Sequence, residues 1–315
     1  MTADACASTA SRSSFVCFDE DWIMPVNRAM NHGLAAFLAV VLTTLVAAPA
    51  AAQERVDPNP GKFAITGGFD LRNAYMFRGI LQDDTGIIAW PYADLALGLH
   101  SGDGGLKSVS VHVGTTNSLN SGVAGSDGRS GKPWYESDVC ASLGLRFGGG
   151  VSVAATYTAY TSPNSMFTTV KEVGLRLAVD DGSGQRAAVV NPYALVAFEL
   201  DTQPGIGQLD GGLHAGKYLE LGIAPTYGAK RLNIGVPVKL GLSVGDYYEL
   251  AGKDRKFGYA SFAGIVTVPL GGIASSNGWN VHGGVEYQVL GDMPKAINDG
   301  DSSKVIGSVG VGFSY

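Results

Sequence analysis

Residues 136–147 read ESDVCASLGLRF, and this stretch decides the fold class. From Val139 to Phe147 every second residue is apolar, while the positions between them are small, polar or charged. A period of two belongs to a β-strand whose two faces meet different surroundings, because successive side chains of a strand point to opposite faces. Residues 232–242 repeat the pattern, with an aliphatic side chain at every even position.

Twelve segments with this period follow one another from Lys62 to the C-terminus, so the sequence predicts an all-β chain. They span approximately residues 62–78, 87–99, 106–115, 134–147, 151–161, 170–180, 188–200, 216–226, 231–244, 256–268, 278–290 and 304–315. In each of them one face is apolar and the other is polar, small or charged.

The connections between these segments alternate in length. The odd-numbered ones are mostly long and polar, at about 79–86, 116–133, 162–169, 201–215, 245–255 and 291–303. The even-numbered ones are generally shorter, at about 100–105, 148–150, 181–187, 227–230 and 269–277. A transmembrane up-and-down barrel has this asymmetry, because its turns are short on one side of the membrane and its loops long on the other. We therefore predict a transmembrane antiparallel β-barrel of about 12 strands in the outer membrane of a Gram-negative bacterium.

The composition excludes other classes of protein. The 315 residues include 45 glycines, and only 16% are charged, which is unusual for a soluble enzyme. Hydrophobic residues make up 45% of the chain, which argues against disorder. The formal net charge of −6 argues against the binding of a nucleic acid through a basic face. Lipid of the outer membrane is the expected surrounding.

A secretory signal peptide is predicted before the barrel. Met30 begins a segment with an apolar stretch at residues 34–46, and small residues, mostly alanine, precede Gln53. We expect residues 1–52, an N-terminal extension and signal peptide, to be removed, and residues 53–315 to form the barrel.

Aromatic residues stand near the ends of the predicted strands, where they are expected to form interfacial girdles. They are Tyr75, Phe77, Trp90, Trp134, Tyr135, Phe147, Tyr227, Phe257, Tyr259, Trp279, Phe313 and Tyr315. The last strand ends on Tyr315 and resembles the terminal strand of bacterial outer-membrane proteins. That resemblance implies the barrel-assembly machinery as a partner.

Residues 67–82 carry a resemblance to a known family. They contain a Tyr-x-Phe-Arg-Gly-x-x-Gln pattern at Tyr75, Phe77, Arg78, Gly79 and Gln82, and the stretch resembles the opening of the TorF family of porins. A weaker similarity to the same family lies in residues 155–163 and 171–174. The resemblance implies an outer-membrane barrel of the porin type.

Ionisable residues lie on the polar faces, which a barrel turns towards its interior. They are Asp70, Arg72, Arg78, Asp94, Glu136, Asp138, Arg146, Glu172, Arg176, Glu199, Glu220, Lys239 and Glu286. Eight of them are predicted to line a pore: Arg72, Arg78, Asp94, Glu136, Arg146, Glu172, Arg176 and Glu286. Acids outnumber bases by eight to five in the full set, so a pore is expected to prefer cations weakly.

Two functions are open for such an interior. Charged residues along a pore would sort small hydrophilic solutes or ions by charge and diameter during passive diffusion. The same residues could instead pair across strands and brace a closed interior. The second interpretation gives a structural or adhesive barrel whose loops at 116–133 and 201–215 contact partners. An oligomer remains compatible with both.

No sequence pattern predicts catalysis, a cofactor or a metal. Ser243 lies in a GLSVG match, but within an alternating strand rather than at a strand-to-helix turn. His112 beside Ser110 imitates an outer-membrane lipase pair, yet such a site faces lipid and both residues lie on the polar face. The histidines after residue 52, His100, His112, His214 and His282, have no metal-ligand spacing. We therefore expect the protein not to be an enzyme.

Overall fold

The computed structural model describes residues 62–129, 132–181, 190–200, 214–229, 232–270 and 278–315. The predicted leader at residues 1–52 lies outside these residues. The main sheet contains β1 (Phe63–Arg72), β4 (Ile88–Ser101), β5 (Leu106–Asn120), β6 (Trp134–Phe147), β7 (Val151–Thr161), β8 (Val170–Val179), β9 (Pro192–Glu199), β10 (Lys217–Ile223), β11 (Thr226–Ala229), β12 (Leu232–Gly235), β13 (Val238–Gly245), β16 (Phe257–Pro269), β17 (Trp279–Leu290) and β18 (Ser303–Ser314). The connections carry β2 (Tyr75–Phe77), β3 (Ile80–Asp83), α2 (Val123–Ser126), η1 (Gly148–Gly150), β14 (Glu249–Leu250), β15 (Lys253–Asp254) and α3 (Asp292–Ile297).

The main sheet closes into a barrel. All of its pairings are antiparallel, and β1 pairs with both β4 and β18, so the first and last strands meet. β10 pairs with β13, and β11 pairs with β12, in one continuous register. β10 and β11 are therefore two parts of one strand, and β12 and β13 are two parts of the next, so the 14 segments form 12 strands. Pro225 and Pro237 lie at the two interruptions, where a proline has no N–H to give to the ladder. The prediction of an all-β antiparallel barrel with about 12 strands is confirmed.

The outward face of the barrel is apolar. Val113, Val139, Leu175 and Phe262 point outwards and are 56, 50, 48 and 55% exposed. Such a wall is costly in water, whereas hydrocarbon requires an apolar face and a closed sheet with every backbone group paired. The described helices are too short to cross a bilayer.

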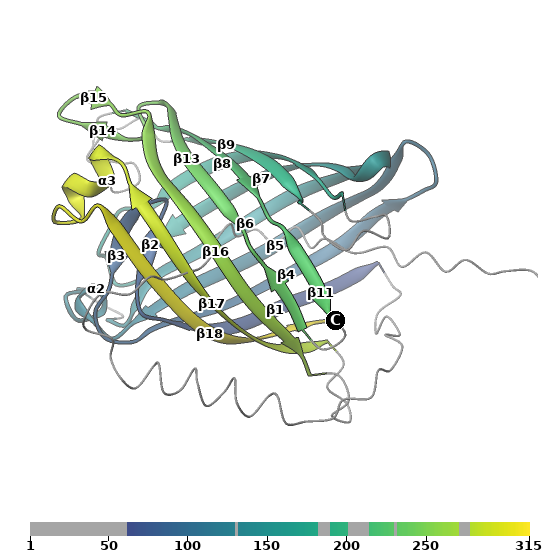
Figure 1. The fold of residues 1–315 in the computed structure, drawn as a ribbon, viewed down its shortest axis with the longest axis horizontal. Helices are drawn as coiled ribbons and strands as arrows, with labels where there is room; N and C mark the ends of the chain where they lie inside the picture. Colours follow the sequence, from purple (N-terminus) through teal and green to yellow (C-terminus); the bar gives the residue numbers. More distant parts are fainter. Residues whose placement is uncertain (1–61, 130–131, 182–189, 201–213, 230–231, 271–277) are drawn as a thin grey trace, which may run out of the picture.

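The two ends of the barrel differ (Figure 1). One end, called the turn end here, carries the short connections at 102–105 and 148–150. The other, called the loop end, carries α2, α3 and the hairpins β2–β3 and β14–β15. The alternation of connection lengths therefore corresponds to a real asymmetry of the molecule.

The predicted end of the first strand is wrong because the connection between β1 and β4 folds inwards. β1 ends at Arg72 instead of residue 78, and the chain then forms β2–β3. Four of the aromatic side chains expected in the girdles, those of Tyr75, Trp90, Tyr135 and Tyr259, are buried around this hairpin or on the strands that face it.

The predicted loop 116–133 is shorter in the structure. β5 extends to Asn120, so residues 116–120 are strand, and α2 occupies part of the predicted loop. Most of the predicted loop 201–215 lies outside the described residues.

Candidate functional site

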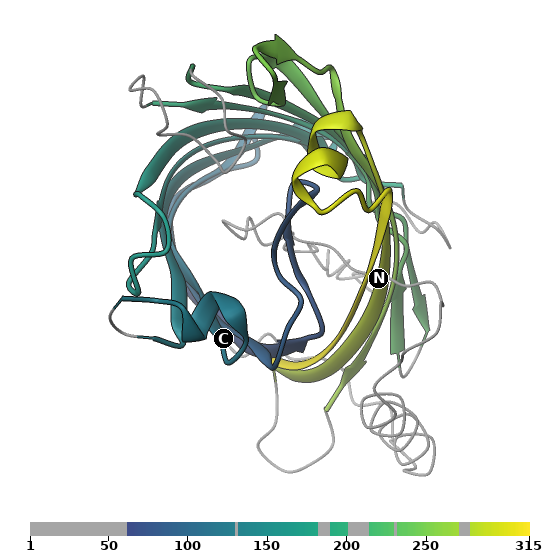
Figure 2. The ribbon, with the colours of Figure 1, turned by 90° about the vertical axis from the view of Figure 1, so that its left-hand side faces the viewer.

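The hairpin β2–β3 lies inside the barrel. Seen along the barrel from the loop end, its two strands run across the opening (Figure 2). Its side chains belong to two apolar clusters. Met76 and Ile80 pack with tyrosines of β10, β16 and the β13–β14 connection, and Tyr75 packs edge-on against Trp90 at a ring distance of 4.7 Å. The hairpin is therefore part of the core and narrows the interior, or lumen.

Arg78, at the tip of the hairpin, is clamped to the barrel wall. Its Nη1 and Nη2 donate hydrogen bonds of 2.6 and 2.9 Å to the two carboxylate oxygens of Glu172 on β8. Nη1 also donates to the Tyr247 hydroxyl at 3.1 Å, and the guanidinium lies 4.1 Å from the centre of the Tyr218 ring. Burial, the largest single cause, lowers the pKa of Arg78, but the charge and hydrogen bond of Glu172 together with Tyr247 and Tyr160 raise that pKa well above its usual value. Arg78 therefore stays positively charged beside Glu172.

Three more contacts position the hairpin. The Tyr75 hydroxyl donates to Glu136 Oε2 on β6 at 2.7 Å, and both side chains are buried. Asn298, after α3, donates to the Gly79 carbonyl at 2.8 Å and accepts from the Leu81 N–H at 2.9 Å. These contacts join residues more than 60 positions apart, so strand periodicity could not predict them.

The residues of the Tyr-x-Phe-Arg-Gly-x-x-Gln pattern all belong to this hairpin. Gly79 has φ +83°, and a Cβ there would lie 3.0 Å from Tyr259, so the turn needs glycine. The Gln82 side chain accepts a 2.7 Å hydrogen bond from the Tyr135 hydroxyl. The pattern thus encodes an inward hairpin and not the end of a membrane-spanning strand.

A cavity of about 120 Å³ lies beside the hairpin in the lumen. Its charged lining consists of Arg72, Arg78, Arg176, Lys239, Asp138, Glu172, Glu220 and Glu286. Several of these side chains contact other residues. The guanidinium of Arg72 lies 3.7 Å from the centre of the Trp90 ring, and that of Arg176 lies 3.7 Å from the centre of the Tyr193 ring. Lys239 forms an ion pair with Glu220 at 3.8 Å. The cavity is polar, and its four cationic side chains balance its four anionic ones.

Of the eight residues predicted to line a pore, five border this cavity: Arg72, Arg78, Glu172, Arg176 and Glu286. The other three lie elsewhere on the inner face. Glu136 is covered by Tyr75, Asp94 pairs with His112 at 3.0 Å, and Arg146 pairs with Asp180 at 3.1 Å near the turn end. Pore lining remains a prediction for all eight.

Glu220 is the centre of a buried network. Its carboxylate accepts hydrogen bonds of 2.8, 2.6 and 2.8 Å from the hydroxyls of Tyr193, Tyr218 and Tyr259. The tyrosines come from β9, β10 and β16, so the network ties three strands across the inner face. Alternation places each tyrosine on this face, but only the closed sheet brings their hydroxyls to one carboxylate.

Two histidines on the inner face pair with aspartates. His112 Nδ1 lies 3.0 Å from Asp94 Oδ1, and its Nε2 lies 3.0 Å from the Ser110 hydroxyl. His282 Nε2 lies 2.7 Å from Asp70 Oδ1, and its Nδ1 lies 2.9 Å from the Asn280 side-chain oxygen. In the sequence each aspartate stands far from its histidine, so neither pair was predicted.

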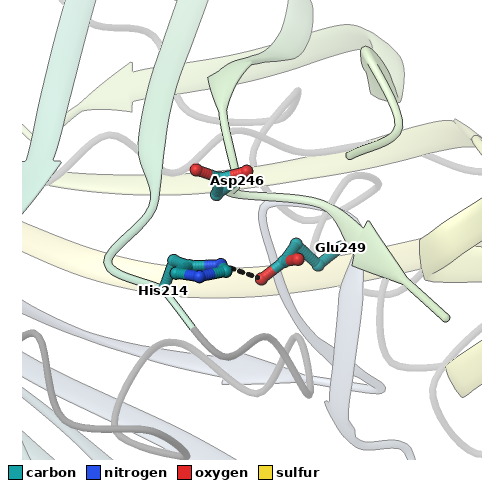
Figure 3. Close-up of side chains that lie close together, drawn as sticks. All are labelled: His214, Asp246 and Glu249. Carbon is teal, nitrogen blue, oxygen red and sulfur yellow. Dashed lines mark hydrogen bonds and ion pairs between the residues drawn. The ribbon is translucent and has the colours of Figure 1, made fainter. Parts of the chain in front are cut away.

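At the loop end, His214, Asp246 and Glu249 offer one ligand atom each within 4.8 Å of one another (Figure 3). His214 Nδ1 lies 3.3 Å from Glu249 Oε2, and the imidazole is 66% exposed. An imidazole nitrogen with two carboxylate oxygens is a donor set that zinc takes in proteins. Sequence analysis found no metal-ligand spacing around His214, because Asp246 and Glu249 lie in a different loop of the chain.

The chain matches no protein-family model and no curated protein. Among solved structures it is similar to the NanC porin, with 12% identity over 80% of this chain and 98% of that chain and a TM-score of 0.44. An outer-membrane channel from Pseudomonas putida F1 shares 7% identity over 84 and 100% of the two chains, with a TM-score of 0.49. Outer membrane phospholipase A from Escherichia coli shares 13% identity over 83 and 95%, with a TM-score of 0.42. The specific resemblance to the TorF family remains a prediction.

Proposed function

We propose that the protein is an outer-membrane channel through which small hydrophilic solutes or ions diffuse passively, with the hairpin β2–β3 as its constriction. One observation carries the proposal. A closed barrel of 12 strands presents an apolar wall to its surroundings and a charged inner face to a cavity of about 120 Å³. The apolar wall suits lipid, and the charged cavity suits a hydrated solute.

The charges of the cavity support a weak ion preference. Its four cationic and four anionic side chains balance one another. The preference for cations expected from the sequence therefore depends on acids outside the cavity, such as Asp70, Asp94 and Glu136 on the inner face. Their field extends along the lumen but is screened by salt within about 10 Å at 0.1 M ionic strength.

Single-channel recording tests the proposal. The refolded protein is added to a planar bilayer, and KCl gradients are applied to read the ion selectivity. Discrete conductance steps with a reversal potential near zero, leaning weakly towards cations, are expected. A folded, heat-modifiable protein that produces no steps would contradict the channel.

A specific observation favours a second function, a structural barrel with a closed interior. The hairpin β2–β3 crosses the lumen and is tied to the wall by the Arg78–Glu172 pair and by the Tyr75–Glu136 hydrogen bond. If neither the unaltered protein nor the Arg78→Ala/Glu172→Gln variant produces conductance steps, the interior is closed by more than this pair, and the structural function is supported.

We also propose that the barrel-assembly machinery recognises β18. This strand closes the barrel against β1, and the side chain of its following residue, Tyr315, is 57% exposed. Deletion of Tyr315 should reduce the amount of folded protein in the outer membrane while leaving refolding in detergent unchanged. An equal loss in both would contradict a role in recognition.

A further inference from the structure

Three inner-face residues, Asp94, His112 and Ser110, form a continuous hydrogen-bonded chain. Ser110 and His112 lie two residues apart on β5, and Asp94 lies on the neighbouring strand β4. With the proton on Nδ1, His112 donates to Asp94 Oδ1 at 3.0 Å, and its Nε2 accepts from the Ser110 hydroxyl at 3.0 Å. We propose that these residues form a serine esterase site that cleaves small, soluble acyl esters in the lumen.

The order of contacts is that of an activated serine. A nucleophilic hydroxyl needs a base within hydrogen-bond reach, and the base needs a third group that fixes its tautomer and stabilises its charged form. Ser110, His112 and Asp94 meet both distance criteria at once. Sequence analysis did not predict Asp94 as the third member of the site, because Asp94 stands 18 residues before His112.

Asp94 is placed to serve His112. The imidazole and the carboxylate are 7 and 5% exposed, so their interaction is largely shielded from water. Asp94 Oδ2 is buried, and within the described part of the chain no hydrogen bond reaches it. Gly114 makes room for this oxygen, since a Cβ at Gly114 would lie 3.1 Å from it.

The second aspartate–histidine pair gives an internal comparison. His282 binds Asp70 through Nε2 and the Asn280 side chain through Nδ1. Neither partner is a hydroxyl or thiol that the imidazole could activate by taking its proton, so this pair lacks the arrangement of an activated serine. His112 differs in one respect that matters for chemistry: its second nitrogen faces a hydroxyl.

The wall around Ser110 is open. Its neighbours in register are Gly98 on β4 and Gly144 on β6, neither of which has a side chain to cover the hydroxyl. Ser110 is half-buried and lies on β5 towards the turn end, away from the hairpin β2–β3. Arg146, on β6, stands opposite Ser108, and its guanidinium, which also donates to Asp180 at 3.1 Å, is the cation that we assign to stabilising an oxyanion. Because the site faces the lumen, membrane phospholipid is excluded as a substrate and a small water-soluble ester is favoured.

The reaction needs only water as a second reactant. The Ser110 oxygen forms a bond to the ester carbonyl carbon while its proton passes to His112 Nε2. The bond from that carbon to the alcohol oxygen breaks, and His112 returns the proton to the departing alcohol. Water then attacks the acyl-serine with His112 as base, which releases the carboxylic acid and restores Ser110.

Two measurements on the refolded full-length protein test the site. The first is covalent labelling by a fluorophosphonate probe, with the modified residue located by mass spectrometry. The second is hydrolysis of p-nitrophenyl butyrate. We expect labelling at Ser110 and ester hydrolysis, with both lost in Ser110→Ala.

The variants separate catalysis from folding. Asp94→Asn should lower kcat by about 10³–10⁴-fold with little change in KM, because the imidazole loses its fixed tautomer. Asp94→Glu, which keeps the carboxylate, should retain a higher kcat than Asp94→Asn. Ser152→Ala removes another inner-face serine, which hydrogen-bonds the Ala178 carbonyl, and His282→Gln disrupts the other pair. Both controls should keep full labelling and full hydrolysis.

The outcomes are decisive in either direction. Labelling that needs Ser110, with hydrolysis that needs both Ser110 and Asp94 in variants that remain heat-modifiable, supports the site. Absence of labelling in the folded protein, labelling at another serine, or hydrolysis unchanged in Ser110→Ala would overturn it. The proposal does not require that the barrel conducts, so silence in a planar bilayer leaves these outcomes unaffected.

Discussion

The Arg78–Glu172 clamp allows a quantitative prediction about how the hairpin β2–β3 is held. The pair makes two hydrogen bonds, of 2.6 and 2.9 Å, and its side chains are only 10 and 5% exposed. Removing one partner of such a pair leaves an uncompensated buried charge and costs roughly 3–5 kcal/mol. We therefore expect Arg78→Ala and Glu172→Gln each to lower the free energy of unfolding by about 3 kcal/mol.

The double variant distinguishes the ion pair from general packing. Once Glu172 is neutral, the loss of Arg78 leaves no charge unpaired, so the two effects should not add and the coupling energy should be about 2–3 kcal/mol. The assay is reversible urea unfolding in lipid vesicles, followed by tryptophan fluorescence. The Arg146–Asp180 pair, with side chains 24 and 17% exposed, is the matched control and should show a coupling of about 1 kcal/mol or less.

The same variants report on the lumen. Arg78→Ala removes one positive charge from the cavity lining and leaves Glu172 facing the cavity, so the proposed channel should become more selective for cations. Coupling below about 0.5 kcal/mol, with an unchanged reversal potential, would show that the clamp neither holds the hairpin nor faces the conduction path, and would refute the reasoning.

Further predictions concern the hairpin tip, the outer wall and the loop end. Asn298→Ala removes two hydrogen bonds to the hairpin and should destabilise the protein by about 1–3 kcal/mol in the same urea assay, whereas an unchanged midpoint would mean that the tip is held by packing alone. Val113→Lys places a charge on the outward face and should cost about 2–4 kcal/mol near the bilayer midplane, while lysine at Thr158 in the cavity lining should cost less; equal losses would argue against a lipid-facing wall. His214→Ala should change the free energy of unfolding by about 1 kcal/mol or less, because its imidazole is 66% exposed. A larger loss would show that the cluster of His214, Asp246 and Glu249 stabilises the fold.

The sequence by itself determined the barrel. Membrane and lumen impose opposite demands on alternate residues of every strand, and this demand is local, so it can be read from a period of two. β6 and β7 accordingly lie at residues 134–147 and 151–161, as the alternation predicted. The strand count survived even where Pro225 and Pro237 interrupt the ladder, since the register continues across them.

What only the tertiary structure decided is how the interior is filled. Tyr75 and Arg78 continue the alternation of β1, yet they leave the sheet and fold into the lumen. Their partners Glu136 and Glu172 stand 61 and 94 residues away. The pairing of His112 with Asp94 was missed for the same reason. Such contacts depend on which residues meet across a closed sheet, and strand periodicity carries no information about that, because it records only which face each side chain occupies.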